Sequence, residues 1–267
     1  YQAAGDWAPA GRLLMDNYFT LTMAGRGETL HALLGVFPAD ACMGDGNLAA
    51  ALAMDSILHG ALDEAAAQFA VARRLAAAAP ADRRRVFDVY LAVIEGELAR
   101  RRNDLLEAQE ALRALEAALG APAEANELRV RPDYWALALM NLGIAELWAG
   151  HPDDARQHLE DALNRTRRIS RPFIEVGCLA HLALAAPLTG QPLPLALELS
   201  ERALAIAEEH GWTSQSMTTG AFAMAGMALV RMGRFAEAEH HLTRAEESLR
   251  TAADRGTEVV LQHARGM

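Results

Sequence analysis

Two side chains could form a nucleophile and its general base. Cys178 and His181 lie three residues apart, so a helix would place the thiol and the imidazole on one face, as thiol catalysis requires. The residues around them are apolar, and no third group is in place to orient the imidazole, so we interpret Cys178 as a buried structural thiol. The chain also lacks the G-x-S-x-G, H-E-x-x-H and glycine-rich phosphate-loop motifs. We therefore expect no catalytic residue and no enzyme.

Histidine pairs are the candidates for a metal site. His151 and His158 lie seven residues apart, without a further ligand at metal spacing. His240 and His241 are adjacent, so a helix would place their side chains on different faces. Neither pair forms a ligand set, so the sequence predicts no bound metal ion.

Two arginine triplets could bind anions. Residues 83–85 follow Pro80 near an expected helix start, where cations are slightly unfavourable. Residues 100–102 end a helix, where cations offset the helix dipole. We interpret both triplets as solvated side chains rather than as ligand sites.

The composition indicates which elements position these residues. Of the 267 residues, 52% are hydrophobic but only 6% are aromatic, and alanine supplies much of the apolar content. Alanine is the best helix former and is poor in strands, which excludes β-sandwiches and barrels and disfavours a parallel α/β sheet. We therefore predict an all-α protein. Because a single core rarely serves a chain of this length, several domains or a helical array are expected.

Charge and cysteine content narrow the classes of function. The 25 Lys+Arg and 35 Asp+Glu give a net charge of −10, whereas nucleic-acid binding needs a basic face. No uncharged apolar run reaches eighteen residues, so we expect no membrane-spanning segment, and no signal peptide is visible. Cys42 and Cys178 form neither a disulfide framework nor a zinc spacing, which fits a reducing cytoplasm.

Apolar residues recur with the period of an α-helix along most of the chain. Glycines divide this pattern where a left-handed C-terminal cap is wanted, at Gly60, Gly120, Gly150, Gly211 and Gly233. Prolines fall at helix starts, where the missing N–H costs little. The helices are expected at 6–23, 28–37, 46–59, 62–79, 82–102, 104–119, 133–149, 152–169, 172–188, 193–210, 214–232, 235–252 and 257–265, with one longer loop at 120–131.

Most of these helices belong to a repeat. Its clearest copy has Gly143 in mid-helix, Gly150 at the turn, and Ala155 and Leu159 along the next helix, which matches the tetratricopeptide pattern. The same frame recurs at 226–245, and weaker copies lie at 60–72, 96–115 and 196–204. The early alanines of the second helices, at 65, 108, 155, 196 and 238, step by 43, 47, 41 and 42 residues, against about 34 in a standard repeat. We predict a right-handed superhelix of long antiparallel hairpins, in which Gly96, Gly143 and Gly226 let two helices cross closely.

The first forty residues carry a further signature. Ala4-Gly5-Asp6-Trp7-Ala8-Pro9-Ala10 precedes Leu13-Leu14, and then come Ala24-Gly25-Arg26, Thr29-Leu30, Leu33-Leu34 and Pro38. This order resembles the region after the ATPase module in large LuxR-type transcriptional regulators similar to MalT. The segments that begin at Gly60 and Gly233 are similar to the sensor repeats of that family as well.

The resemblance implies a signal-transduction protein of three parts. An upstream module would bind ATP, this superhelix would sense an inducer or a partner, and a downstream helix-turn-helix would bind DNA. We then expect the chain to be a piece of a longer protein, with residues 1–45 as a junction or cap that completes a truncated repeat and residues 46–267 as the sensor domain. It has no phosphate loop and no basic recognition helix, so no cofactor, nucleic acid or membrane is expected to bind it directly. A stand-alone tetratricopeptide scaffold for protein–protein interaction remains the alternative.

In a tetratricopeptide stack the first helix of each hairpin lines the concave face. The candidate residues there mix methionine, aromatic and polar side chains, which suits a groove for a small-molecule inducer, a peptide or a protein segment. Burial against neighbouring helices is the competing interpretation of each. The candidates are Met54, Tyr90, Glu97, Arg101, Met140, Ile144, Trp148, His181, Met227 and Arg231.

Overall fold

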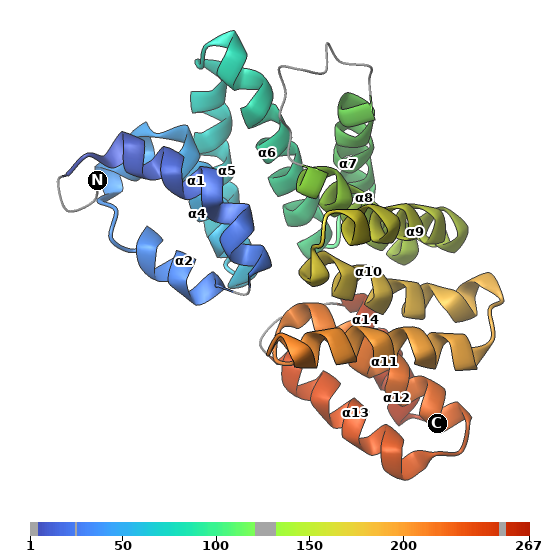
Figure 1. The fold of residues 1–267 in the computed structure, drawn as a ribbon. Helices are drawn as coiled ribbons and strands as arrows, with labels where there is room; N and C mark the ends of the chain where they lie inside the picture. The colour runs from blue at the N-terminus through green and yellow to red at the C-terminus, as the bar shows by residue number, and fades with distance from the viewer. Residues whose placement is uncertain (1–4, 25, 121–131, 251–254) are drawn as a thin grey trace. The chain divides into compact units, whose positions relative to one another are not determined.

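The structure is a computed structural model that describes residues 5–24, 26–120, 132–250 and 255–267. In this part of the chain all regular secondary structure is helical and no strand is present (Figure 1). The all-α prediction is therefore confirmed. The expected loop at 120–131 lies outside the described residues, apart from Gly120, which ends a helix.

Residues Tyr1–Val130 form one compact unit. Two hairpins, α4 with α5 and α6 with α7, make up most of it, and α1, α2 and α3 pack on α4. The helices are α1 (Trp7–Met23), α2 (Gly27–Leu34), α3 (Ala39–Gly44), α4 (Gly46–Leu58), α5 (Leu62–Ala77), α6 (Ala81–Arg101) and α7 (Leu105–Gly120).

Residues Arg131–Met267 form a second compact unit. Its hairpins pair α8 with α9, α10 with α11 and α12 with α13. They stack in chain order, since α9 also packs on α10 and α11 on α12, while α14 packs on α12 and α13. The helices are α8 (Pro132–Trp148), α9 (Pro152–Arg168), α10 (Pro172–Ala185), α11 (Leu193–Glu209), α12 (Thr219–Arg231), α13 (Phe235–Leu249) and α14 (Arg255–Arg265), with the 3₁₀ helices η2 (Ala186–Thr189) and η3 (Ser216–Thr218).

Three hairpins close through a glycine on the first helix and a leucine on the second. A methyl group added at Gly96 would lie 2.6 Å from Leu112 Cγ, and one added at Gly143 would lie 2.7 Å from Leu159 Cγ. Gly226 makes an equally close approach to Leu242. The predicted role of these three glycines in close helix crossings is confirmed. In each hairpin the leucine follows the glycine by sixteen residues.

Four of the five glycines predicted at helix ends have left-handed backbone, three of them inside a hairpin and Gly211 between two hairpins. Gly60, Gly150, Gly211 and Gly233 have φ values of 76°, 87°, 72° and 75°, a conformation that residues with a Cβ adopt at a cost. Gly120 is instead the last residue of α7. Asn103 and Ser170 take the same role at other helix ends, with φ values of 63° and 52°.

Three predicted helices have different bounds. The segment expected as 28–37 ends at Leu34, and α3 follows Pro38 as a separate helix that was not predicted. The helix expected at 172–188 becomes α10 and then η2, because Pro187 lacks the N–H that would continue the α-helical ladder. The helix expected at 214–232 starts as η3 and becomes α-helical only at Thr219.

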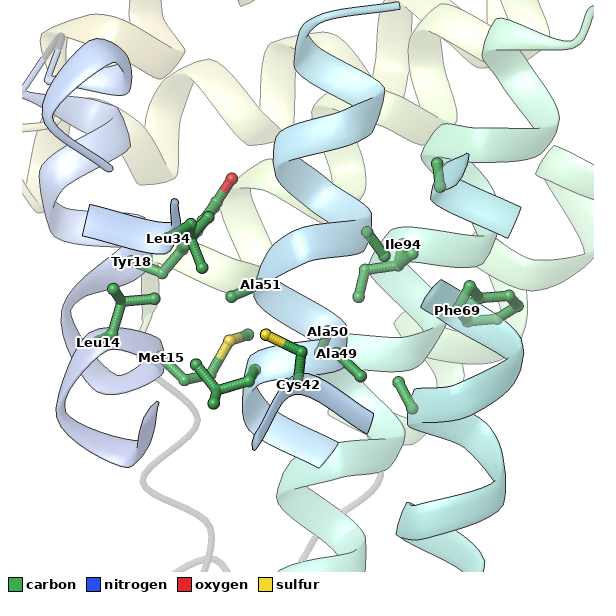
Figure 2. Close-up of a cluster of buried hydrophobic side chains, with 14 of the residues drawn as sticks. Leu14, Met15, Tyr18, Leu34, Cys42, Ala49, Ala50, Ala51, Phe69 and Ile94 are labelled. Carbon is green, nitrogen blue, oxygen red and sulfur yellow. The ribbon is translucent and has the colours of Figure 1, made fainter. Parts of the chain in front are cut away.

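A buried hydrophobic cluster of the first unit runs from α1 to α6. Leu14 and Tyr18 of α1, Leu34 of α2 and Cys42 of α3 lie in the same buried cluster as Ile94 of α6 (Figure 2). Helices α1, α2 and α3 therefore share their core with the hairpins that follow. The domain boundary expected at residue 46 stays a prediction.

One stretch is long and apolar enough to cross a membrane by length and composition. It runs from Pro172 to Thr189, and 67% of it is buried inside the protein. This stretch was not predicted from the sequence because Glu175 interrupts its apolar run. Its burial is that of a core helix, since α10 packs against α8, α9, α11 and α12.

Candidate functional site

In the first unit, four predicted ligand-contacting residues lie on the first helices of the two hairpins. Met54 belongs to α4, and Tyr90, Glu97 and Arg101 belong to α6. Met54 and Tyr90 are half-buried, and Met54 packs against the core. Glu97 is buried. The last turn of α6 therefore holds polar groups away from water.

Glu97 binds two arginines of its own helix. Arg100 donates from Nη2 to Oε1 at 2.6 Å and from Nε to Oε2 at 3.1 Å. Arg101 donates from Nε to Oε1 at 3.1 Å. Only 11% of the Arg100 side chain and 16% of the Arg101 side chain are exposed. The interpretation of this triplet as solvated is therefore wrong for Arg100 and Arg101, because a carboxylate one turn earlier on the same face draws both guanidinium groups inward.

The two guanidinium groups control the charge of Glu97. Burial by itself raises the pKa of a carboxyl group, but the charges of Arg100 and Arg101 and their hydrogen bonds outweigh it and lower the pKa of Glu97 to about 2.

The other described arginines of the two triplets have different partners. Arg102 donates to Asp63 at 3.2 Å and to the Leu62 carbonyl at 3.1 Å. In the other triplet, Arg84 is exposed and donates to the carbonyl groups of residues 77 and 79, and the side chains of residues 83 and 85 are outside the described part.

In the second unit, the remaining predicted residues lie mostly between helices. Met140 is half-buried, and its sulfur lies 2.6 Å from where a Cβ of Gly177 would be. Ile144 is buried, with 3% exposed. Trp148 is half-buried and contacts Gly256 of α14.

His181 and Met227 continue this pattern, and Arg231 departs from it. His181 is buried, and its Nδ1 lies 2.8 Å from the Gly177 carbonyl oxygen. Met227 packs half-buried between two apolar clusters. Arg231 at the end of α12 is the one residue of this group in the second unit that is exposed. Long helices bury more of each first helix against its neighbours, so the contact of these residues with a ligand stays a prediction.

The Cys178 thiol is a structural group, as predicted. It is fully buried in α10 and forms no disulfide. Burial, followed by the charge of Glu175, raises the pKa of Cys178 far above its ordinary value, which removes the thiolate needed for attack on a substrate.

Two buried acids of the second unit have partners in other helices. The Glu146 carboxylate lies 2.6 Å from Nδ1 of His158, which joins α8 to α9. Asp133 of α8 accepts a hydrogen bond from Arg171 at 2.7 Å. Within the described residues, no group of three metal-ligating side chains includes His151, His158, His240 or His241.

A different set of side chains, which was not predicted from the sequence, has metal-ligand geometry. Ligand atoms of His31, Asp55 and His59 all lie within 4.8 Å of one another. Asp55 and His59 are four residues apart on one helix, which is a readable signal. His31 comes from α2, twenty-four residues earlier than Asp55, so only the fold brings it to them.

Comparison with known proteins identifies the fold. No family model matches the chain, and no curated protein matches it. The apo form of RapI aligns over 96% of this chain and 71% of its own, with 14% identity and a TM-score of 0.59. A Rap protein complexed with competence and sporulation factor aligns over 90% of this chain and 62% of its own, with 13% identity and a TM-score of 0.62.

A third solved structure shows the same likeness. The Rap conjugation gene regulator of the plasmid pLS20, in complex with the Phr* peptide, aligns over 96% of this chain and 78% of its own, with 15% identity and a TM-score of 0.62. These alignments and the hairpin architecture assign the chain to the TPR-like helical-repeat fold. The predicted fold class is confirmed.

Proposed function

We propose that this chain is a regulatory helical-repeat protein that binds an extended peptide or a protein segment through the first helices of its hairpins. The observation that carries the proposal is the shared fold with Rap proteins, of which one was solved with competence and sporulation factor and another with the Phr* peptide. This likeness favours the scaffold alternative over the MalT-like sensor. Regulation within the cytoplasm, without catalysis, is part of the same proposal.

Arg101 is the residue that we assign to peptide contact in the first unit. Among the described residues, its guanidinium group bonds to Glu97 through Nε alone, so its two Nη groups can donate to another acceptor. Glu97 fixes the plane of the guanidinium group, which lowers the entropic cost of binding. Tyr90 lies on the same helix and supplies an aromatic surface. This chemistry fits a peptide with a carboxylate, either at its C-terminus or on a side chain.

Selection from a random heptapeptide library displayed on phage, followed by calorimetric titration of an enriched synthetic peptide, tests this proposal. Substitution Arg101→Gln should weaken binding of that peptide by about tenfold, because one charge-assisted hydrogen bond contributes about 1.5–3 kcal/mol. Arg74→Gln on the second helix α5 is the matched control, since Arg74 is exposed on a second helix. Failure to enrich any peptide, or equal affinities for the wild type and Arg101→Gln, would contradict the proposal.

The MalT-like sensor is the second candidate function, and the signature in residues 4–38 favours it. In that reading an inducer binds the repeats and shifts a parent ATPase between two states, while ATP and DNA bind to other modules. The Rap structures do not support this link. A thermal-shift screen of sugars, nucleotides and natural-product scaffolds separates the two candidates, because a small molecule that raises the Tm in a concentration-dependent way favours the sensor.

A further inference from the structure

Three side chains with metal-ligating atoms meet in the first unit, where α2 approaches the C-terminal end of α4. His31 lies in the last turn of α2, Asp55 lies in the last turn of α4, and His59 is the residue that caps α4. We propose that His31, Asp55 and His59 form a binding site for a divalent transition-metal ion, with Zn²⁺ as the ion that the ligand set fits. This site does not depend on the proposed peptide binding.

The spacing of the ligand atoms is close to that of a zinc site. His31 Nδ1 lies 2.8 Å from Asp55 Oδ2, and His59 Nδ1 lies 3.5 Å from Asp55 Oδ1. The two imidazole rings are 4.4 Å apart, centroid to centroid. Tetrahedral zinc with bonds of about 2.1 Å holds its ligand atoms about 3.4 Å apart. Small rotations of the two imidazole rings therefore suffice to admit the ion.

The exposure of the three side chains suits entry of an ion from solvent. The side chains of His31 and His59 are 57% and 40% exposed, so both rings can rotate. The Asp55 side chain is only 11% exposed and supplies a negative charge at the base of the site. His59 Nδ1 also lies 2.8 Å from the Asp55 carbonyl oxygen. Ligation of the ion through His59 Nδ1 would replace this hydrogen bond.

The donor set selects the class of ion. Two imidazole nitrogens and one carboxylate oxygen suit zinc and its neighbours in the first transition row, whereas calcium and magnesium prefer sites made of oxygen. Three protein ligands leave one position of a tetrahedral ion for water.

Bound metal would link two parts of the first unit that are separate in sequence. His31 precedes the first hairpin, whereas Asp55 and His59 belong to it. An ion held by all three would tie α2 to α4 and would stabilise the native state alone, because the unfolded chain does not hold the ligands together.

Calorimetric titration of the full chain with ZnCl₂, after treatment with a chelator and dialysis, tests the proposal. We expect one Zn²⁺ per chain and a Tm, followed by circular dichroism, that rises with zinc concentration and returns to its initial value with EDTA. His31→Ala and His59→Ala should each weaken zinc binding by at least tenfold and remove most of the Tm shift. His263→Ala is the matched control, since His263 is an exposed histidine in α14 of the second unit.

Each result of these titrations either supports or excludes a zinc site at His31, Asp55 and His59. Both variants change exposed side chains, and their circular dichroism without zinc checks that they fold. Zinc binding that is equal in the wild type and both variants would overturn the site, as would a wild-type Tm that does not respond to zinc. Co²⁺ gives a second readout, because tetrahedral coordination produces visible absorption that His59→Ala should abolish.

Discussion

Arg171 and Asp133 join two successive hairpins of the second unit. Arg171 donates from Nε to Asp133 Oδ1 at 2.7 Å and from Nη2 to Oδ2 at 3.3 Å. Asp133 lies in the first turn of α8, and Arg171 is the residue that precedes α10. Hydrogen bonding to Asp133 raises the pKa of Arg171, so the guanidinium group keeps its charge.

Substitution Arg171→Met should lower the free energy of unfolding by about 2–3 kcal/mol. The Asp133 side chain is only 5% exposed and would lose this guanidinium group while staying buried. Urea unfolding at pH 7 measures the change. The control is Arg156→Met, which breaks an exposed pair with Glu160 one turn away and should cost less than about 0.5 kcal/mol. Equal effects of the two substitutions would show that the Asp133 pair adds nothing to stability.

Alanine substitutions at Gly143 and Gly177 should have different effects. A Cβ at Gly143 would meet Leu159 Cγ at 2.7 Å and the Ala155 carbonyl oxygen at 3.0 Å, and the backbone atom cannot move aside. We expect Gly143→Ala to destabilise the protein by about 1–3 kcal/mol. A Cβ at Gly177 would meet the flexible Met140 side chain, so Gly177→Ala should be near neutral once the gain in helix propensity of about 1 kcal/mol is included. Thermal unfolding of both variants tests the contrast, and a neutral Gly143→Ala would contradict it.

The contribution of Glu97 to stability should depend on pH. Its folded-state pKa of about 2 lies below the unfolded value of 4.5, so its stabilisation is fully present above pH 4.5 and is lost as the pH falls toward 2. A difference of this size corresponds to about 3 kcal/mol. Urea unfolding of the wild type and Glu97→Gln at pH 7 and at pH 3 should therefore give stabilities that differ more at the higher pH. A difference that does not change with pH would contradict the assignment.

Both cysteines should resist thiol reagents in the native protein. Cys178 is fully buried and Cys42 is 8% exposed, and burial raises the pKa of each thiol. With Ellman's reagent at pH 8, neither should react until denaturant is added, and both should then react at once. The Cys178→Ala and Cys42→Ala variants assign the signals. Rapid native labelling of Cys178 would contradict its place in the core.

Much of the fold could be predicted from glycine and proline positions. The glycines at the turns and crossings mark the hairpins because few other residues fit left-handed backbone or a close helix contact. The helix at Ala39–Gly44 was missed because six residues are too few for a periodic pattern. The ends of α10 and α12 differ because proline and local 3₁₀ turns override the apolar pattern.

The polar clusters were predicted less well, for two different reasons. The contacts of Arg100 and Arg101 with Glu97 could have been read from spacings of three and four residues on one helix. The approach of His31 to Asp55 has no local signal, because it depends on how α2 folds back on α4. Among the predicted ligand-contacting residues, Ile144 and His181 are buried because stacked neighbours cover both sides of long first helices.

The interval of sixteen residues between Gly96 and Leu112, repeated at Gly143 and Gly226, fixes the rotational phase of these three hairpins. One inserted residue inside that interval would turn the second helix by about 100° and carry its leucine away from the glycine. Insertions between hairpins leave the phase unchanged. Duplication of a whole hairpin is therefore compatible with this architecture, and variation in length is confined to the segments that connect one hairpin to the next.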